Sequence, residues 1–175
     1  MMFNIGNKVV YPSQGPCLIG AEENKIVAGR ATRFYRLTLL DDSGDSVFVP
    51  VDKLKALRMR HLMSKSEIPK LPNHLENTVT TSKNWKQRAI DNLKLMSSGS
   101  AFDLAEIVES LTVLNEIKAL SLRDRQTLDK AKKFLVCEIS EVMEETKSTA
   151  KEQVDKALGR KEAEKDPPNI RVEFE

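Results

Sequence analysis

The sequence predicts an α+β fold in which a small antiparallel β-barrel comes first and an all-helical part follows. Within the first 50 residues, short β-prone runs alternate with turn residues, and no helical pattern separates them. From residue 82 onward, apolar residues recur at three- and four-residue spacing, which is typical of amphipathic helices. A chain of 175 residues can hold one medium domain or two small ones.

Five short strands are expected in the first part, and each ends at turn residues. They cover residues 8–11, 17–21, 23–27, 33–40 and 46–50. The loop 41–45 consists of residues that tolerate left-handed backbone angles, so it predicts a tight hairpin. Alternation along the fourth strand places Leu37 and Leu39 in the core. Five strands without an intervening helix are typical of a small barrel of the SH3 or Tudor type.

The periodicity changes after residue 51. Residues 52–58 predict a short helical turn, and the first long helix is expected from Ser82, a candidate N-cap, to about residue 96. The next helix begins at Asp103 with the apolar stripe Leu104, Ile107, Val108, Leu111 and Leu114.

Ser121 is the candidate cap of a third helix, and residues 149–158 predict a last short one. The apolar stripe expected on the third helix is Leu122, Leu128, Ala131, Leu135, Val136 and Ile139. We therefore expect a β domain over residues 1–58 and a helical domain over residues 59–158. Residues 159–175 are charged and contain consecutive prolines, which predicts a disordered tail.

Charge is unevenly divided along the chain. The first hundred residues contain fifteen Lys/Arg and nine Asp/Glu, a net +6, whereas the remainder contains thirteen and seventeen, a net −4. A modest basic surface followed by an acidic end fits a protein that touches DNA without coating it.

Trp85 is the only tryptophan and is surrounded by cations in the segment 81–88. This pattern fits an apolar wedge against nucleic-acid bases, with neighbouring cations holding phosphates. The alternative from these eight residues alone is a Trp that packs its helix onto a neighbour.

Three stretches resemble the CarD/CdnL family of bacterial transcription regulators. Residues 3–12, with Gly15 shortly after, are similar to the family's first strand and turn. Residues 84–93, with Trp85 at their start, resemble its tryptophan helix, and residues 120–135 resemble a later helix. The resemblance covers about residues 1–145, in the family's order and spacing.

The resemblance implies a Tudor-like domain that docks on the β subunit of RNA polymerase and a helical domain that touches promoter DNA. It implies that Trp85 wedges into the minor groove at the upstream edge of the melted bubble and hinders its closing. The expected polymerase contacts are Lys25, Arg36 and Phe48. The expected DNA contacts, weak and tolerant of sequence, are Trp85, Lys83, Lys86, Arg88, Lys94, Arg123 and Arg125.

Two departures from the family pattern concern these contacts. Basic residues typically follow the family's Trp where this chain has Gln87 and Ile90, so phosphate contacts are expected to be fewer or shifted. Some members have an arginine where this chain has Phe48, which would contact the polymerase through apolar surface.

An enzyme is not expected. His61 and His74 are the two histidines, neither is near a cysteine or in metal-ligand spacing, and no glycine-rich phosphate loop occurs. The acidic run Glu138, Glu141, Glu144 and Glu145 favours a solvated helix flank. Cys17 and Cys137 are expected as buried small hydrophobes, without a disulfide. We expect no catalytic residue, no cofactor and no metal.

No apolar run approaches the roughly 20 residues that span a bilayer, so no membrane partner is expected. We expect a monomer in the cytoplasm, associated with the nucleoid through RNA polymerase. The alternative function is a protein–protein adaptor whose barrel binds another partner and whose Trp85 is a core residue. A third is a sequence-specific repressor with high DNA affinity in the absence of polymerase.

Overall fold

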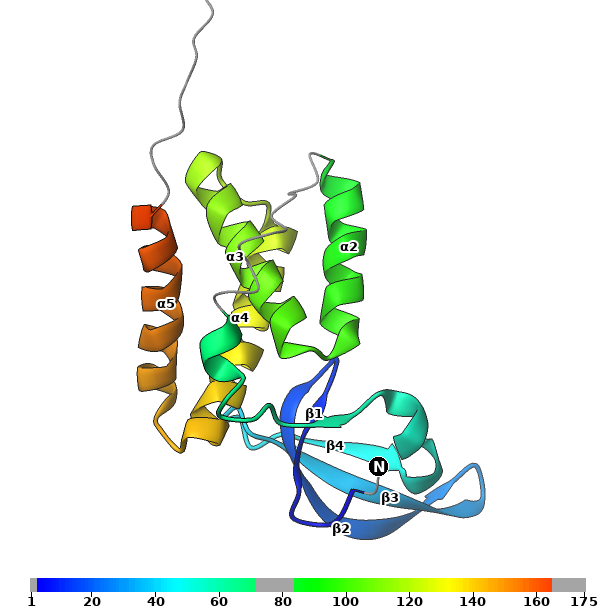
Figure 1. Cartoon of the computed structure of the whole chain (residues 1–175). Coiled ribbons are helices and arrows are strands. Elements are labelled where there is room, and N and C mark those ends of the chain that lie inside the picture. The colour runs from blue at the N-terminus through cyan, green and yellow to red at the C-terminus, as the bar shows by residue number, and fades with distance from the viewer. Residues whose placement is uncertain (1–2, 72–83, 165–175) are drawn as a thin grey trace, which may run out of the picture.

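The computed structural model describes residues 3–71 and 84–164. The N-terminal part is one antiparallel sheet of five strands in the order β4-β3-β2-β1-β5, and helices follow it (Figure 1). The strands are β1 (Lys8–Tyr11), β2 (Gly15–Val27), β3 (Arg30–Leu39), β4 (Ser46–Pro50) and β5 (Arg60–His61). The predicted α+β class is confirmed.

The sheet is open, which corrects the prediction of a closed barrel. β4 and β5 lie at its opposite edges. The chain between them forms the 3-10 helix η1 (Val51–Leu57), close to the short helical turn predicted at 52–58. Leu54 of η1 is buried in the same core cluster as Val9, Leu37 and Val49. A helical turn therefore covers the sheet core where a barrel would need further strand pairing.

Two strands differ from the sequence prediction. The strands predicted at 17–21 and 23–27 are one strand, β2, because a bulge between Ile19 and Glu22 absorbs the break in register. The fifth strand is β5, whose Arg60 pairs with Val10, so the sheet extends beyond the expected domain boundary at 58. The hairpin at 41–45 is confirmed by left-handed backbone angles at its second and fourth residues.

The helices are α2 (Trp85–Ser98), α3 (Ala101–Ile117), α4 (Leu122–Met143) and α5 (Lys147–Glu164). Ser121 caps α4 as predicted, since its side chain accepts a hydrogen bond from the Asp124 amide. The cap of α2 is Asn84 and not Ser82, which lies outside the described residues. α5 continues through residues 159–164, which were expected to begin the disordered tail.

The predicted apolar stripes make the helical core, with one exception. All five predicted residues of the α3 stripe are buried. On α4 the residues from Leu128 onward are buried or partly buried, but Leu122 is 73% exposed. It is the first residue of the helix and lies before the point where α4 meets its neighbours. Leu37 is fully buried in the sheet core and Leu39 packs against it, as predicted.

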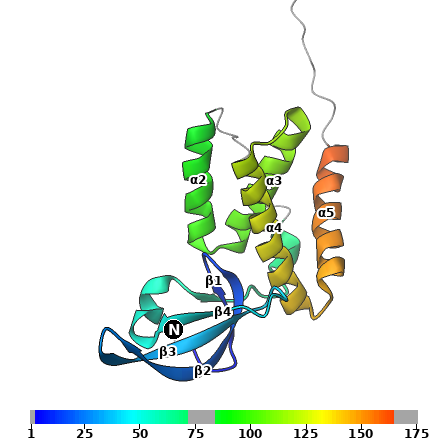
Figure 2. The same cartoon turned by 180° about the vertical axis from the view of Figure 1, so that it is seen from behind.

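The helical bundle stands on one side of the sheet, with α3 and α4 between α2 and α5 (Figures 1 and 2). The C-terminal end of α2 lies next to the sheet, and its N-terminal end points away from it. Side chains from the two parts meet closely, because a Cβ at Gly15 would lie 2.6 Å from Cδ1 of Phe134. α4 therefore packs directly on the sheet at the start of β2.

Both cysteines are buried and free, as predicted. Burial raises the pKa of the Cys17 thiol to about 12 and that of the Cys137 thiol to about 12. At neutral pH both thiols therefore stay protonated and behave as small core side chains.

Candidate interaction surfaces

Trp85 is the first residue of α2, and 59% of it is exposed. The Asn84 side chain accepts a hydrogen bond of 2.9 Å from the Lys86 amide and so fixes the helix start. Nζ of Lys86 lies 5.5 Å from the centroid of the indole ring. The core interpretation of Trp85 is therefore wrong, and a flat apolar side chain with an adjacent cation is available to a partner.

Arg88 lies one helical turn after Trp85 but is buried, with 6% of it exposed. Its Nη2 and Nε donate to the two carboxylate oxygens of Asp124 at 2.8 and 3.2 Å. This guanidinium holds the pKa of the Asp124 carboxyl below its usual range, and the Ser121 hydroxyl also lowers it. Arg88 thus joins the first turns of α2 and α4 and does not offer a cation to a phosphate.

A groove of about 220 Å³ lies between α2 and α4, toward the C-terminal side of Trp85 along α2. Trp85 shares a helix face with Ala89 and Asn92, which lie four and seven residues later and line the groove. Arg123 is exposed and lines the opposite wall with Lys130. The indole and the Arg123 guanidinium therefore lie on one side of the helix pair.

The other predicted cations do not join this group. Lys94 is exposed nine residues after Trp85, which places it about 180° around the helix. Arg125 is exposed about 200° around α4 from Arg123, away from the groove. Lys83 lies outside the described residues, as does His74.

Two apolar residues at the same end of the bundle were missed by sequence reasoning. Ile117 is the last residue of α3 and Leu122 the first of α4, and they are 75% and 73% exposed. Both helix ends lie away from the sheet, as the N-terminal end of α2 does (Figure 1). The signal available in the sequence was their position at the helix ends, where a side chain has fewer neighbours to pack against.

The predicted polymerase residues come together on the outer face of the sheet. Lys25 of β2 places its Nζ 3.0 Å from the centroid of the Phe48 ring on β4, and the guanidinium carbon of Arg36 lies 5.7 Å from it. Arg36 pairs directly with Phe48 in the register of β3 and β4. Its Nη2 also lies 2.7 Å from Oε1 of Glu23. We call Lys25, Arg36 and Phe48 the sheet-face patch.

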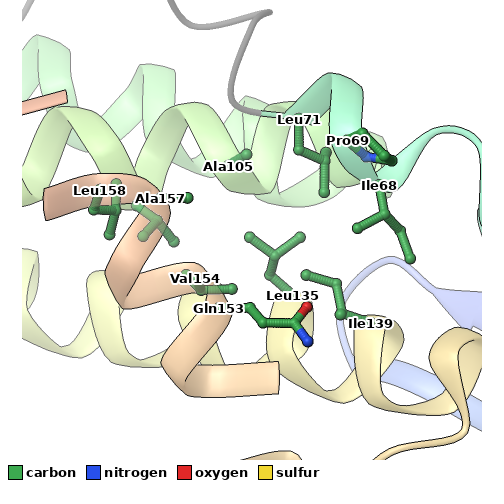
Figure 3. A pocket seen from close by; sticks show the side chains of 11 residues that line it. Ile68, Pro69, Leu71, Ala105, Leu135, Ile139, Gln153, Val154, Ala157 and Leu158 are labelled. Carbon is green, nitrogen blue, oxygen red and sulfur yellow. The ribbon is translucent and has the colours of Figure 1, made fainter. Parts of the chain in front are cut away.

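An apolar pocket of about 210 Å³ lies between α3, α4, α5 and the short helix η2 (Ile68–Lys70) (Figure 3). Among the residues that the structure describes, Gln153 is the one polar residue that lines it. A pocket without a charged group offers no acid, base or phosphate ligand.

In the parts of the chain that the structure describes, no three His, Cys, Asp or Glu side chains gather in a way that could hold a metal ion. Over the same residues, no helix is long and apolar enough to cross a membrane.

Known proteins match both parts of the chain. Residues 3–63 match the CarD-like/TRCF RID domain, and residues 74–155 match the CarD C-terminal domain. The Bacillus subtilis (strain 168) protein named "Putative transcription factor YdeB" is 28% identical over 141 residues, which cover 79% of this chain and 90% of that protein. The open sheet and the helical bundle correspond to the two matched regions, and the chain belongs to the CarD family of transcription regulators.

Proposed function

We propose that this transcription regulator binds the β subunit of RNA polymerase through the sheet-face patch and stabilises the open promoter complex. Trp85 acts as the wedge, entering the minor groove at the upstream edge of the melted bubble. The observation that carries the proposal is the 59% exposure of the indole at the N-terminal end of α2, a helix whose start is capped and anchored.

The size of the effect follows from the chemistry of an aromatic wedge. Unstacking a base step costs a few kcal/mol, and contact with an inserted side chain offsets this cost. Stacking of an aromatic ring on a base contributes roughly 1–3 kcal/mol, which favours the melted state by about five- to a hundred-fold. Such a factor modulates an existing equilibrium and does not melt a promoter unaided.

Among the residues that the structure describes, few cations lie beside the indole, which supports a weak intrinsic affinity for DNA. Lys86 is adjacent to the indole and Arg123 lies on the same side of the helix pair, whereas Arg88 is neutralised by Asp124. Since non-specific DNA affinity grows with the number of phosphates neutralised, these two described cations contribute little binding. The polymerase supplies the remaining binding energy and places the wedge at the bubble.

The sheet-face patch has the chemistry of a protein contact. An aromatic ring with two cations beside it fits a partner surface that combines apolar and acidic groups. Glu23 already pairs with Arg36, whereas Lys25 contacts the Phe48 ring and can offer its charge to an acidic group of a partner. Binding of the full-length protein to the isolated β subunit tests this half of the proposal, and failure to bind contradicts it.

The wedge is tested with a fluorescent adenine analogue placed in the promoter at the upstream edge of the bubble. Unstacking of the analogue raises its emission. With polymerase present, the wild-type protein should raise the emission, and Trp85→Ala should not. Lys94→Ala, on the opposite side of α2, is the control and should behave as wild type. An equal rise with Trp85→Ala would contradict the wedge.

A further inference from the structure

Glu138 lies in the C-terminal part of α4 and is fully buried, which corrects its expected place on a solvated helix flank. Its Oε1 accepts hydrogen bonds from Nη1 of Arg60 at 2.5 Å and from the Met63 amide at 2.8 Å. Its Oε2 accepts from Nη2 of Arg60 at 2.9 Å. Three donors therefore satisfy a carboxylate that has no access to water.

Arg60 connects three elements through one side chain. It belongs to β5, the edge strand paired with β1, and its two terminal nitrogens bind Glu138 of α4. Its Nε donates a hydrogen bond of 2.6 Å to the carbonyl oxygen of Gly99, the residue that ends α2. The planar guanidinium fixes the directions of these bonds, so the sheet edge, α4 and the end of α2 are held at defined angles.

The end of α2 also rests directly on the sheet. Gly99 has a φ of +76°, and a Cβ at this position would lie 2.9 Å from Cγ of Pro12, which follows β1. The turn therefore has no room for a side chain. Arg60 and Pro12 together define how the base of α2 meets the sheet.

Over residues 3–71 and 84–164, the other ion pairs between the sheet with its loops and the helices lie near the surface. They are Lys8 with Glu141, Lys133 with Asp41, and Lys147 with Asp42. Pairs of this kind contribute little, because solvent screens them. The Arg60–Glu138 pair differs, because its carboxylate is fully buried and three directed hydrogen bonds fix its geometry.

We infer that Arg60 and Glu138 are positioning residues that set the angle between the sheet and α2 and thereby place Trp85 relative to the sheet-face patch. The inference rests on the proposed function. Arg88 ties the Trp85 end of α2 to the start of α4, so a tilt at this junction carries both helices together. α2 has 14 residues and is about 20 Å long, so a tilt of about 10° at its base moves the Trp85 end by about 3 Å. That displacement is about one base step of DNA, roughly 3.4 Å.

The test uses the full-length double variant Arg60→Met with Glu138→Leu. It removes both charges and leaves no unpaired buried ion, so the expected cost in stability is smaller than that of either single substitution. Residual dipolar couplings measured by NMR on strands β2–β4 and on helices α2–α4 report the relative orientation of the two parts. We expect each part to keep its own structure while their relative orientation departs from that of the wild type.

The functional readout is the open-complex fraction on a promoter with saturating protein. The double variant should bind polymerase within about two-fold of wild type and lose at least half of the gain in open complex. Lys147→Met, which removes a surface pair between the same two parts, is the control and should keep both the orientation and the gain. If the double variant does not fold, Arg60→Lys is measured instead, because lysine keeps the charge but cannot bind Glu138 and Gly99 together.

Unchanged couplings in the variant would overturn the inference whatever the promoter assay gives. A changed orientation with the full gain retained would also overturn it, since Trp85 would then not depend on the junction. If the wild-type protein does not raise the open-complex fraction, the proposed function fails, and the couplings still decide whether Arg60 and Glu138 set the orientation.

Discussion

The outer sheet face and the free end of the helical bundle assemble their surfaces in different ways. On the sheet, the pairing of β3 with β4 puts Arg36 opposite Phe48, and Lys25 reaches the same ring from β2. At the bundle end, Trp85 is exposed, but Arg88 three residues later is buried against Asp124. Strand alternation alone decides which side chains share a face, whereas the exposed face of a helix depends on its neighbours.

The two regions therefore offer different side-chain chemistry to their partners. The sheet-face patch combines an aromatic ring with cations that touch it, which suits docking on a protein surface. The bundle end exposes the large apolar side chains Trp85, Ile117 and Leu122, which suits insertion between bases. Changes at each region should therefore affect separate measurements.

The largest expected effect comes from breaking the pair that anchors the wedge. Arg88→Met leaves the buried Asp124 carboxylate without its guanidinium, and the free energy of unfolding should fall by about 3 kcal/mol. Urea unfolding measures this loss. Lys86→Met, an exposed neighbour on the same helix, should change the unfolding free energy by less than about 0.5 kcal/mol. A loss below about 1 kcal/mol for Arg88→Met would show that the pair does not anchor α2.

A second contrast compares two glycines with left-handed backbones. Gly99→Ala should lower the unfolding free energy by about 2 kcal/mol, because the new methyl group is strained and meets Pro12. Gly6→Ala has a similar φ but open space around its Cβ, so about 1 kcal/mol of strain alone is expected. Thermal unfolding of both variants measures the difference. Equal losses would mean that Pro12 yields and does not define the base of α2.

On the sheet, Phe48→Ala should weaken binding to the polymerase β subunit by about ten-fold, which corresponds to about 1.4 kcal/mol. The variant removes the ring that Lys25 and Arg36 contact. Binding of the purified proteins measures the change. Ile26→Ala removes an exposed apolar side chain from the opposite face of β2 and should bind as wild type. Equal affinities of the two variants for the β subunit would show that the docking surface lies outside the sheet-face patch.

The smallest effect concerns a surface pair between the two parts of the chain. Contact with Lys133, together with hydrogen bonds from Ser43, lowers the pKa of Asp41 to about 2. Because the folded-state pKa is depressed, this stability is present above about pH 4 and is lost as the pH falls toward 2. Lys133→Met should therefore cost less than about 1 kcal/mol at pH 5, since Lys133 is more than half exposed.

The cost should shrink in acid unfolding curves as the pH falls toward 2, where about half of the Asp41 carboxyls of the folded wild type are protonated. A difference that persists unchanged to pH 2 would show that Lys133 acts through packing and not through charge.

Much of the fold could be predicted because local patterns determine it. The α3 stripe and the Ser121 cap are confirmed, since periodicity and capping are properties of neighbouring residues. The open sheet could not be predicted, because closure depends on pairing between distant strands. The bulge within β2, where two separate strands were expected, also has no clear local pattern in the sequence.

The buried charges show where sequence reasoning failed. Glu138 lies in an acidic run and Arg88 among surface cations, and each looks solvated in the sequence. Their partners, Arg60 and Asp124, lie 78 and 36 residues away. A charge pattern along one helix carries no information about such partners, so only the tertiary packing separates a surface ion from a buried one.

The most direct test of the central claim is the equilibrium fraction of open complex on a promoter labelled in its melting region, with polymerase alone, with the wild-type protein and with Trp85→Ala. We predict that the wild-type protein raises the fraction and that Trp85→Ala loses most of this gain while still binding polymerase. An equal gain with Trp85→Ala, or no gain with the wild-type protein, would contradict the claim that this chain stabilises the open complex through its tryptophan.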